Sequence, residues 1–378
     1  MAASKKLATA AVLVSLLALL VGPSAGLLGS GPGCSVFVGW PVLSILNSLI
    51  CGLLGGNYTP PVRRNPPTGK ELSFGYYNNP NNTASYCPGA EAAVTGAVKK
   101  AIDQQGRGVG AGLIRLFFHD AFVRGCDASV LLKNTVAAGD NTEREGPPNK
   151  DSLRGFDVID AAKEATKAAC GGRNVVSCAD ILAFAARDAS DILSGGRIKF
   201  AMPAGRFDGR ESFASETNQL PGPDSTLENL KEMFDAQGLS EADMVTLSGA
   251  HSIGRARCLF FTNRLSDMNS GYAGQLRAAC KSPDTRVDQD PFSPDFDPDN
   301  LDNQYYKNID KFVLFNSDAV LFSPGTTKEQ VKANADNATK WEADFAAAMV
   351  RMGNIGVKTT QVAGLTEIRE VCWRVNNA

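Results

Sequence analysis

Apolar residues recur every three or four positions through most of the chain beyond Gly89, which is the spacing of amphipathic helices. Val94, Val98 and Ile102 form one such stripe, in a segment that ends at Gly106. Further stripes lie at Leu113, Leu116 and Phe117; at Phe156, Ile159 and Ala162; and at Ala179, Leu182, Ala185 and Ala186. Strand signals are few, because no polar–apolar alternation is longer than about four residues. The sequence therefore predicts a mainly α fold with few short strands.

Two predicted helices begin with a capping-box pattern, a serine followed three positions later by an acidic residue. Ser225 and Glu228 open one helix, and Gly238 suits its end. Ser240 and Asp243 open the next helix, which runs toward the segment that holds His251.

Residues 1–26 have the order of a secretory signal peptide. Two lysines precede an apolar run over residues 11–21, and small residues follow it. Such a leader implies an oxidising compartment, where disulfides persist. Acceptor sequons for glycosylation, which suit a secreted chain, begin at Asn57, Asn81 and Asn337.

Residues 27–71 form an apolar and proline-rich extension whose fate the sequence leaves open. The stretch 36–54 contains Pro41 and Asn47, and it is barely long enough to span a bilayer. We favour a leader or pro-segment over a membrane anchor. Prolines and arginines between residues 58 and 65 suit a linker. The folded domain is therefore predicted to span residues 72–378.

Charge and histidine content narrow the range of functions. The 38 Lys+Arg and 40 Asp+Glu residues nearly balance, which gives no electrostatic case for nucleic acid or an anionic membrane as a partner. His119 and His251 are the only two histidines. Any histidine-dependent chemistry must use one or both of them.

Arg115 and His119 lie four residues apart on a predicted helix and so share a face, with Phe118 beside it. A fixed cation, a neutral imidazole and an apolar wall suit the cleavage of a peroxide bond. The imidazole moves a proton from one oxygen to the other, and the guanidinium stabilises the charge that develops. For the pair alone, we favour the alternative of a surface arginine near a buried, hydrogen-bonded histidine.

An oxygen-rich turn follows His119. It offers the kind of oxygen donors that Ca²⁺ prefers, and these come from Asp120, Val123, Gly125, Asp127 and Ser129. The spacing is not that of an EF-hand, and the alternative interpretation is a solvated acidic loop.

The segment LIRLFFHDAFVRGCDASVLL resembles the distal motif of plant secretory (class III) haem peroxidases. The resemblance implies that Arg115 and His119 are catalytic, with Phe118 beside them, and that the oxygen-rich turn binds a distal calcium. TEREGPPNKDSLRGF resembles the family's next block. It implies that Glu143 supports this calcium through water, and that Asn149 accepts a hydrogen bond from His119 that fixes the tautomer.

The segment LSGAHSIG resembles the family's proximal motif, which implies that His251 is the axial ligand of the haem iron. By the same resemblance, Asp318 in NSDAVLF accepts a hydrogen bond from His251 and orients it. A proximal calcium is implied at a loop that is slightly shorter here than the family's pattern. Its implied ligands are Ser252, Asp295, Asp297, Asn300 and Asp302.

The resemblance covers nearly all of the chain beyond Leu72 and implies two helical lobes that enclose haem b, with a distal and a proximal Ca²⁺. The implied activity is the hydrogen-peroxide-dependent one-electron oxidation of small phenolic donors, with Pro221 as a donor contact. It implies a secreted monomer of the cell wall or apoplast. The implied roles are phenolic cross-linking, lignin metabolism or the oxidative-stress response.

Nine cysteines are present, and their pairing does not follow from the sequence alone. The resemblance implies the disulfides Cys87–Cys170, Cys178–Cys372 and Cys258–Cys280. A fourth family bridge lacks its first partner, because Ala121 stands at that position and leaves Cys126 unpaired. The loss of such a short-loop disulfide lowers the free energy of unfolding by about 2 kcal/mol. Cys34 and Cys51 pair with each other, pair with Cys126, or are removed by processing.

Two other functions compete with the peroxidase assignment. One is a secreted haem- or calcium-binding wall protein without turnover, which the Ala121 departure favours. The intact set of Arg115, His119, Asn149 and His251 argues against it. The other is a metal-dependent hydrolase that uses the acidic loops. It leaves both histidines unexplained, because neither belongs to a His-x-x-x-His pair.

Overall fold

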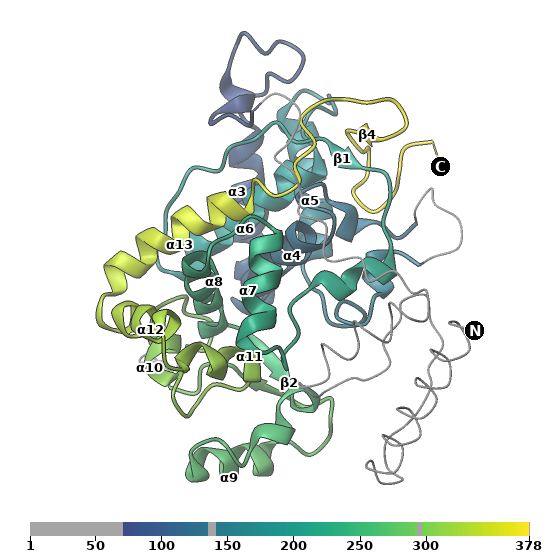
Figure 1. Cartoon of the computed structure of the whole chain (residues 1–378). Helices are drawn as coiled ribbons and strands as arrows, with labels where there is room; N and C mark the ends of the chain where they lie inside the picture. Colours follow the sequence, from purple (N-terminus) through teal and green to yellow (C-terminus); the bar gives the residue numbers. More distant parts are fainter. Residues whose placement is uncertain (1–70, 135–140, 293–296, 378) are drawn as a thin grey trace, which may run out of the picture. The chain divides into compact units, whose positions relative to one another are not determined.

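The computed structural model describes residues 71–134, 141–292 and 297–377 (Figure 1). The predicted signal peptide and the extension up to residue 70 lie outside these ranges, as do Cys34, Cys51, Asn57 and Asp295. No helix within the described ranges is long and apolar enough to cross a membrane.

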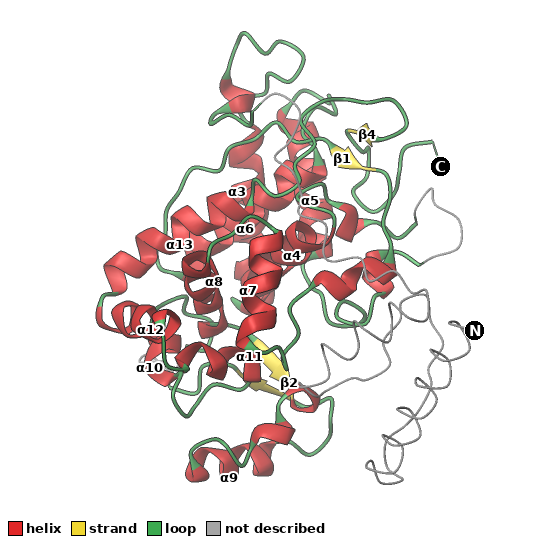
Figure 2. Cartoon of the chain, viewed as in Figure 1, coloured by secondary structure: helices red, strands yellow, loops and turns green. Residues whose placement is uncertain are grey.

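The described residues are mainly helical, as the apolar spacing predicts (Figure 2). The helices of the first half are α3 (Ala90–Gln105), α4 (Gly108–Val123), α5 (Phe156–Ala169) and α6 (Cys178–Leu193). Those of the second half are α7 (Leu227–Ala236), α8 (Glu241–Ser248), α9 (Ser270–Ala279), α10 (Gln304–Asn308), α11 (Asn316–Ala319), α12 (Thr326–Asp336) and α13 (Ala338–Met352). The strands β1 (Asp208–Gly209) and β4 (Thr366–Glu367) pair antiparallel, and so do β2 (Arg255–Arg257) and β3 (Arg286–Asp288).

Helices α4 and α6 lie in the middle of the core. Helix α4 packs against α6, and α3 packs against both α5 and α6 (Figure 1). The side chains of Leu113, Leu116, Phe117 and Phe122 on α4 are fully buried. A helix that is apolar on nearly all sides has to lie inside the protein. The same helix carries Arg115 and His119, so the core holds both of them.

The second half packs around Trp341 of α13. Helix α8 contacts α12 and α13, and the buried Trp341 Nε1 donates to the Thr246 carbonyl at 3.2 Å. Helix α8 leads directly into the 3₁₀ turn Gly249–Ser252, which carries His251. Gly249 permits this turn, because a Cβ there would lie 2.6 Å from the Tyr306 hydroxyl. Packing against α10 and α13 thus fixes the backbone beside His251.

One predicted helix start is confirmed and the other is wrong by one residue. Ser240 Oγ accepts from Asp243 N, and the Asp243 carboxylate accepts from Ser240 N, both at 3.0 Å. Helix α7, however, is capped by Thr226, whose Oγ1 accepts from Asn229 N at 3.2 Å. Ser225 Oγ accepts from Gly222 N at 3.0 Å within the preceding turn. Both hydroxyls can cap a helix, and the turn uses the first.

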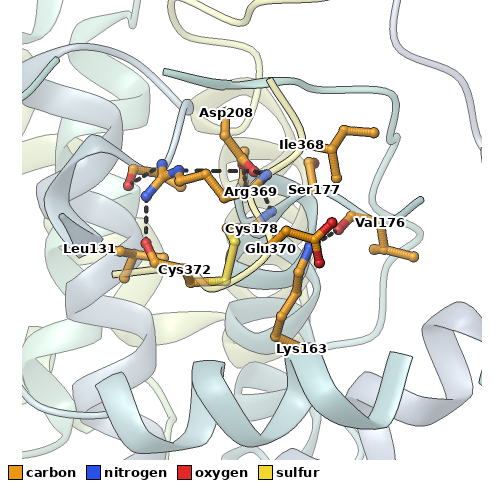
Figure 3. Close-up of a disulfide and its surroundings, with 12 residues drawn as sticks. Leu131, Lys163, Val176, Ser177, Cys178, Asp208, Ile368, Arg369, Glu370 and Cys372 are labelled. Carbon is orange, nitrogen blue, oxygen red and sulfur yellow. Dashed lines mark hydrogen bonds and ion pairs between the residues drawn. A yellow bond between two sulfur atoms is a disulfide. The ribbon is translucent and has the colours of Figure 1, made fainter. Parts of the chain in front are cut away.

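The three implied disulfides Cys87–Cys170, Cys178–Cys372 and Cys258–Cys280 are formed in the structure. The bond Cys178–Cys372 joins the start of α6 to the C-terminal segment (Figure 3). Asp208 lies beside it and accepts hydrogen bonds from Cys178 N at 3.1 Å and Arg369 N at 2.9 Å. One buried carboxylate therefore caps α6 and fixes the C-terminal segment at the same place.

Cys126 is fully buried and forms no disulfide within the described residues. Its Sγ donates to the Met352 carbonyl at 3.3 Å, and its backbone N donates to the Ile355 carbonyl at 2.8 Å. Arg369 Nη2 donates to the Ala128 carbonyl at 2.7 Å. Hydrogen bonds from the C-terminal segment thus hold the loop that the fourth bridge clips in the family.

Candidate active site

His119 lies on the buried face of α4 and is held by an amide. Its Nδ1 lies 2.6 Å from Asn149 Oδ1. Asn149 Nδ2 in turn donates to the Glu143 carbonyl at 2.8 Å, so the Asn149 oxygen faces the imidazole. Nδ1 must therefore carry the proton, and Nε2 keeps its lone pair. This arrangement makes Nε2 a base.

The pKa of His119 lies well below its usual value of 6.5. Burial is the main cause, and the charge of Arg115 adds to it. The hydrogen bond that His119 donates to Asn149 opposes both effects in part. The imidazole is therefore neutral at physiological pH and ready to accept a proton.

Arg115 lies one helical turn before His119 and is held by the loop that carries Asn149. Its Nη1 donates to the Ser152 carbonyl, and its Nη2 donates to the Pro148 carbonyl and to Ser152 Oγ, each at 3.0 Å. Arginine has five N–H donors, so two of them make no hydrogen bond to the described residues. These two N–H groups are available to a ligand.

His251 is held by a carboxylate instead of an amide. Its Nδ1 lies 2.7 Å from Asp318 Oδ1. The Tyr305 hydroxyl donates to the same oxygen at 2.9 Å. The carboxylate can only accept, so Nδ1 carries the proton and Nε2 is free to bind a metal.

The pKa of His251 is raised above 6.5. Burial lowers this pKa, but the charge and hydrogen bond of Asp318 more than offset the effect. The His251 side chain is nevertheless 39% exposed, whereas Asp318 is 4% exposed. His251 therefore stays accessible on part of its surface, while the carboxylate that binds its Nδ1 is buried.

Arg115 connects the two imidazoles electrostatically. Its charge lowers the pKa of His119 and also acts to lower that of His251. The guanidinium is only partly exposed, and burial lowers its own pKa to about 10. Phe118, next to His119, is likewise only partly buried within the core. Side chains from α4 and from the His251 turn therefore border the same region.

Further arginines lie at one edge of this region. Arg154, Arg286 and Arg257 each act to lower the pKa of Arg115. Arg257 Nη2 donates to the Asp151 carbonyl at 2.6 Å, and Arg154 is exposed. A cavity of about 600 Å³ lies beside them and is lined by Arg107, Arg154 and Arg255 among others. Asp157 and Asp299 line the same cavity, so its charge is mixed. The exposed Arg154 can pair with a ligand that carries a carboxylate.

Asp120 and Asp127 of the oxygen-rich turn form a buried acidic cluster together with Glu143. Ser129 Oγ and both Glu143 carboxylate oxygens are buried without a hydrogen-bond partner among the described residues. Burial and the charge of Asp127 raise the pKa of Asp120 to about 8. Burial and the two aspartates raise the pKa of Glu143 well above its usual value. Such a cluster favours a bound cation.

The described residues contain no group of three or more His, Cys, Asp or Glu side chains arranged to hold a metal ion. An ion at the acidic cluster would therefore also need oxygens of other kinds. The Ser129 hydroxyl and the carbonyls of Val123 and Gly125 are of the kind that Ca²⁺ accepts.

The predicted proximal ligands are only partly brought together. Ser252 is fully buried, and its Oγ accepts from Asp302 N at 3.3 Å. Asn300 Nδ2 donates to Asp302 Oδ2 at 2.8 Å. Asp297 forms an ion pair with Arg107 at 2.9 Å. The structure thus joins Ser252, Asn300 and Asp302, while it gives Asp297 a cationic partner of its own.

Pro221 lies partly buried in the turn before α7. The Pro223 carbonyl in this turn accepts from Ser317 N at 3.0 Å, next to Asp318. Phe122 of α4 meets Phe234 of α7 with ring centres 4.9 Å apart. The turn is thus tied to the segment that holds Asp318.

Several side chains at the site carry no signal in the sequence pattern. Tyr305 reaches Asp318, and Lys358 forms an ion pair with Asp127. The spacing of charged residues along the chain gives no hint of either contact. Only the aromatic pair Tyr305–Tyr306, next to the predicted calcium loop, marks the first one.

Comparison with known proteins gives consistent matches. The family model described as peroxidase matches residues 94–337, more than half of the chain. Peroxidase 2 of Zea mays is 45% identical over 314 residues, which cover 81% of this chain and 90% of the relative. Peroxidase 5 of Vitis vinifera is 42% identical over 323 residues, covering 81% and 92%. The lignin-forming anionic peroxidase of Nicotiana sylvestris is 40% identical over 314 residues, again covering 81% and 92%.

Proposed function

The chain belongs to the peroxidase family, and we propose that it uses hydrogen peroxide to oxidise small phenolic donors with His119 as base and His251 as metal ligand. The observation that carries this assignment is that the two imidazoles have different surroundings and opposite pKa shifts. Burial and the nearby charge of Arg115 keep His119 neutral, whereas the carboxylate of Asp318 makes His251 electron-rich.

The residues present fit a haem. His251 has a free Nε2 and a partly exposed side chain, which suits an axial ligand of iron. The arginines at the edge of the region suit the haem's carboxylates. When bound, the haem supplies the redox equivalents for peroxide reduction and donor oxidation.

The chain's own residues move the proton and stabilise charge. His119 Nε2 takes a proton from one peroxide oxygen and returns it to the other, which leaves as water. The two free N–H groups of Arg115 stabilise the negative charge that develops as the O–O bond breaks. Asn149 holds His119 in the tautomer that this transfer needs. Phe118 and the surrounding apolar side chains limit access by water.

We assign phenols as donors because a phenolic O–H can give up one electron and one proton. Two phenols reduce one hydrogen peroxide to two waters and become two phenoxyl radicals. The name of the Nicotiana relative indicates a role of that protein in lignin formation. Pro221, in the turn that is tied to the Asp318 segment, is the proposed donor contact. Phenolic cross-linking of the cell wall, lignin metabolism and the oxidative-stress response are the proposed roles.

Two calcium sites complete the proposal. Asp120, Val123, Gly125, Asp127 and Ser129 would hold the distal ion, with Glu143 bound through water. The unpartnered oxygens of Ser129 and Glu143 support this site. Ser252, Asp297, Asn300 and Asp302 would hold the proximal ion together with Asp295. The ion pair of Asp297 with Arg107 makes its place in that set the weakest.

We further propose that residues 1–26 direct secretion to the cell wall or apoplast, that residues 27–71 are an extension, and that the catalytic domain of residues 72–378 acts as a monomer. Three disulfides within the described residues support an oxidising compartment. Asn81 and Asn337 are both exposed, which suits glycosylation.

The test follows the reaction of the haem-loaded chain with peroxide by rapid-mixing absorption spectroscopy. The wild-type protein should react quickly and then oxidise a simple phenol. His119→Ala should retain haem and react slowly, while His251→Ala should bind haem poorly. Equal peroxide reactivity of wild type and His119→Ala contradicts the proposed base.

A further inference from the structure

The buried acidic cluster already contains a cation from the chain itself. Lys358 Nζ forms an ion pair with Asp127 Oδ2, and Asp127 is fully buried. The Lys358 side chain is 28% exposed, so its stem reaches inward from the surface.

Backbone hydrogen bonds hold Lys358 and Asp127 beside the same segment. The Lys358 carbonyl accepts from Phe207 N at 2.6 Å, and the Asp127 carbonyl accepts from Gly209 N at 2.8 Å. A Cβ at Gly209 would lie 2.3 Å from Asp127 Oδ2. Only glycine therefore leaves room for the carboxylate beside the lysine. The segment 206–209 thus touches both partners of the ion pair.

The C-terminal segment is pressed against the loop at a second place. Gly125 has φ +88°, and a Cβ on it would lie 2.6 Å from Gly356 Cα. Cys126 N also donates to the Ile355 carbonyl at 2.8 Å. Lys358 therefore follows directly after a close backbone contact, which limits how far its ammonium can move from Asp127.

Counting formal charges shows what the lysine changes. The three buried carboxylates of Asp120, Asp127 and Glu143 carry three negative charges when ionised, and Lys358 neutralises one. A divalent cation would then lie close to a fixed positive charge, and like charges in a poorly solvated region repel strongly. Ser129 Oγ and the Glu143 oxygens, which have no partner among the described residues, still point to a ligand at the cluster.

We propose that Lys358 is an internal cation that competes with calcium at the distal acidic cluster and holds the loop when calcium is absent. The inference rests on the calcium site of the proposed function. The loop after His119 would therefore keep its structure at low calcium, although it lacks the disulfide at Cys126. Calcium binds there more weakly than it would without the lysine.

The test compares the haem-loaded full chain as wild type, Lys358→Met and Lys358→Arg. Calcium titration of chelator-treated protein gives the affinity, and Ser129→Ala identifies which binding event belongs to the distal cluster. Lys358→Met should bind this calcium at least about tenfold more tightly, because the repelling charge is gone. Lys358→Arg should resemble wild type. Lys340→Met is the matched control, since it removes a lysine from an exposed pair with Asp344.

Thermal unfolding with and without chelator gives the second readout. Chelation should lower the Tm of Lys358→Met clearly more than that of wild type. The proposal is overturned if the calcium affinity and the Tm loss of Lys358→Met both equal those of wild type.

A third outcome separates this proposal from the calcium assignment. If no Ser129-dependent calcium binds to any variant, the distal calcium of the proposed function is wrong. A drop in Tm for Lys358→Met, with none for Lys358→Arg, then supports the lysine as the cluster's cation. An unchanged Tm overturns it. Peroxide-dependent phenol oxidation, measured in the same preparations, reports on the catalytic assignment separately.

Discussion

The two histidines are the same residue in two opposite settings. Burial and the charge of Arg115 lower the pKa of His119 well below 6.5, and the hydrogen bond from its Nδ1 to the neutral amide of Asn149 offsets this only in part. His251 donates through Nδ1 to the carboxylate of Asp318, which raises its pKa despite burial. Burial lowers both values, and the partner on Nδ1 decides the net direction.

This difference separates the two roles that the proposed reaction requires. A base must release its proton again, which a weakly basic imidazole does readily. A metal ligand gains electron density when its other N–H is bound to a carboxylate. Substituting the residues that contact each histidine should therefore change its pKa or its strength as a metal ligand in a predictable direction.

The largest effect is expected from His119→Ala. Loss of a general acid–base should slow the reaction with peroxide by about 10²–10⁴-fold. Rapid-mixing absorbance at several peroxide concentrations gives the rate constant. Haem content should be unchanged, in contrast to His251→Ala. Loss of haem from both variants would show that the two histidines do not have separate roles.

Arg115→Leu should have the next largest effect, a decrease of about 10²–10³-fold in the same rate constant. Two of its five N–H donors are free of described partners, and these are the ones expected to act on peroxide. Removing the positive charge should also raise the pKa of His119. The acid limb of the pH–rate profile should therefore move to higher pH. An unmoved limb argues against the electrostatic contact.

Asp318→Asn should make His251 a weaker ligand, with about 10–100-fold loss in haem retention or activity. The matched control is Tyr305→Phe, which keeps the carboxylate and removes only one hydrogen bond to it. Haem transfer to a competing apoprotein measures retention, and the reduction potential should rise in Asp318→Asn. Equal behaviour of the two variants would assign the effect to packing instead of charge.

Asn149→Val should have the smallest effect, about tenfold on the rate with peroxide. The Asn149 hydrogen bond raises the pKa of His119, so its removal should lower that pKa further. Wild type should keep its full rate as the pH falls through 6.5, because His119 stays neutral there. In Asn149→Val the acid limb should begin at still lower pH. A shift to higher pH contradicts the assigned hydrogen bond.

Helices and helix caps could be predicted from the sequence, but not all with the same accuracy. The stripes on α3, α4, α5 and α6 predicted those helices, because residues three and four apart meet on one helix face. The capping box at Ser240 was equally local. The cap of α7 was misplaced by one residue, because Ser225 and Thr226 are chemically alike and only the turn at Gly222 distinguishes them.

Contacts between distant segments were predictable only by resemblance, or not at all. His251 and Asp318 lie 67 positions apart, and the resemblance alone linked them. Lys358 and Asp127 lie 231 positions apart, and nothing in the spacing linked them. The ion pair between Asp297 and Arg107 likewise has no signal in the spacing.

The sequence by itself determined the helical class, the two histidines available for chemistry, and the shared face of Arg115 and His119. These properties depend on composition and on neighbours within one or two turns. The tertiary structure alone decided the opposite pKa shifts of the histidines, the partial exposure of His251 and the lysine in the acidic cluster. The reason is that charge, burial and hydrogen bonding act through space, between segments that only packing brings together.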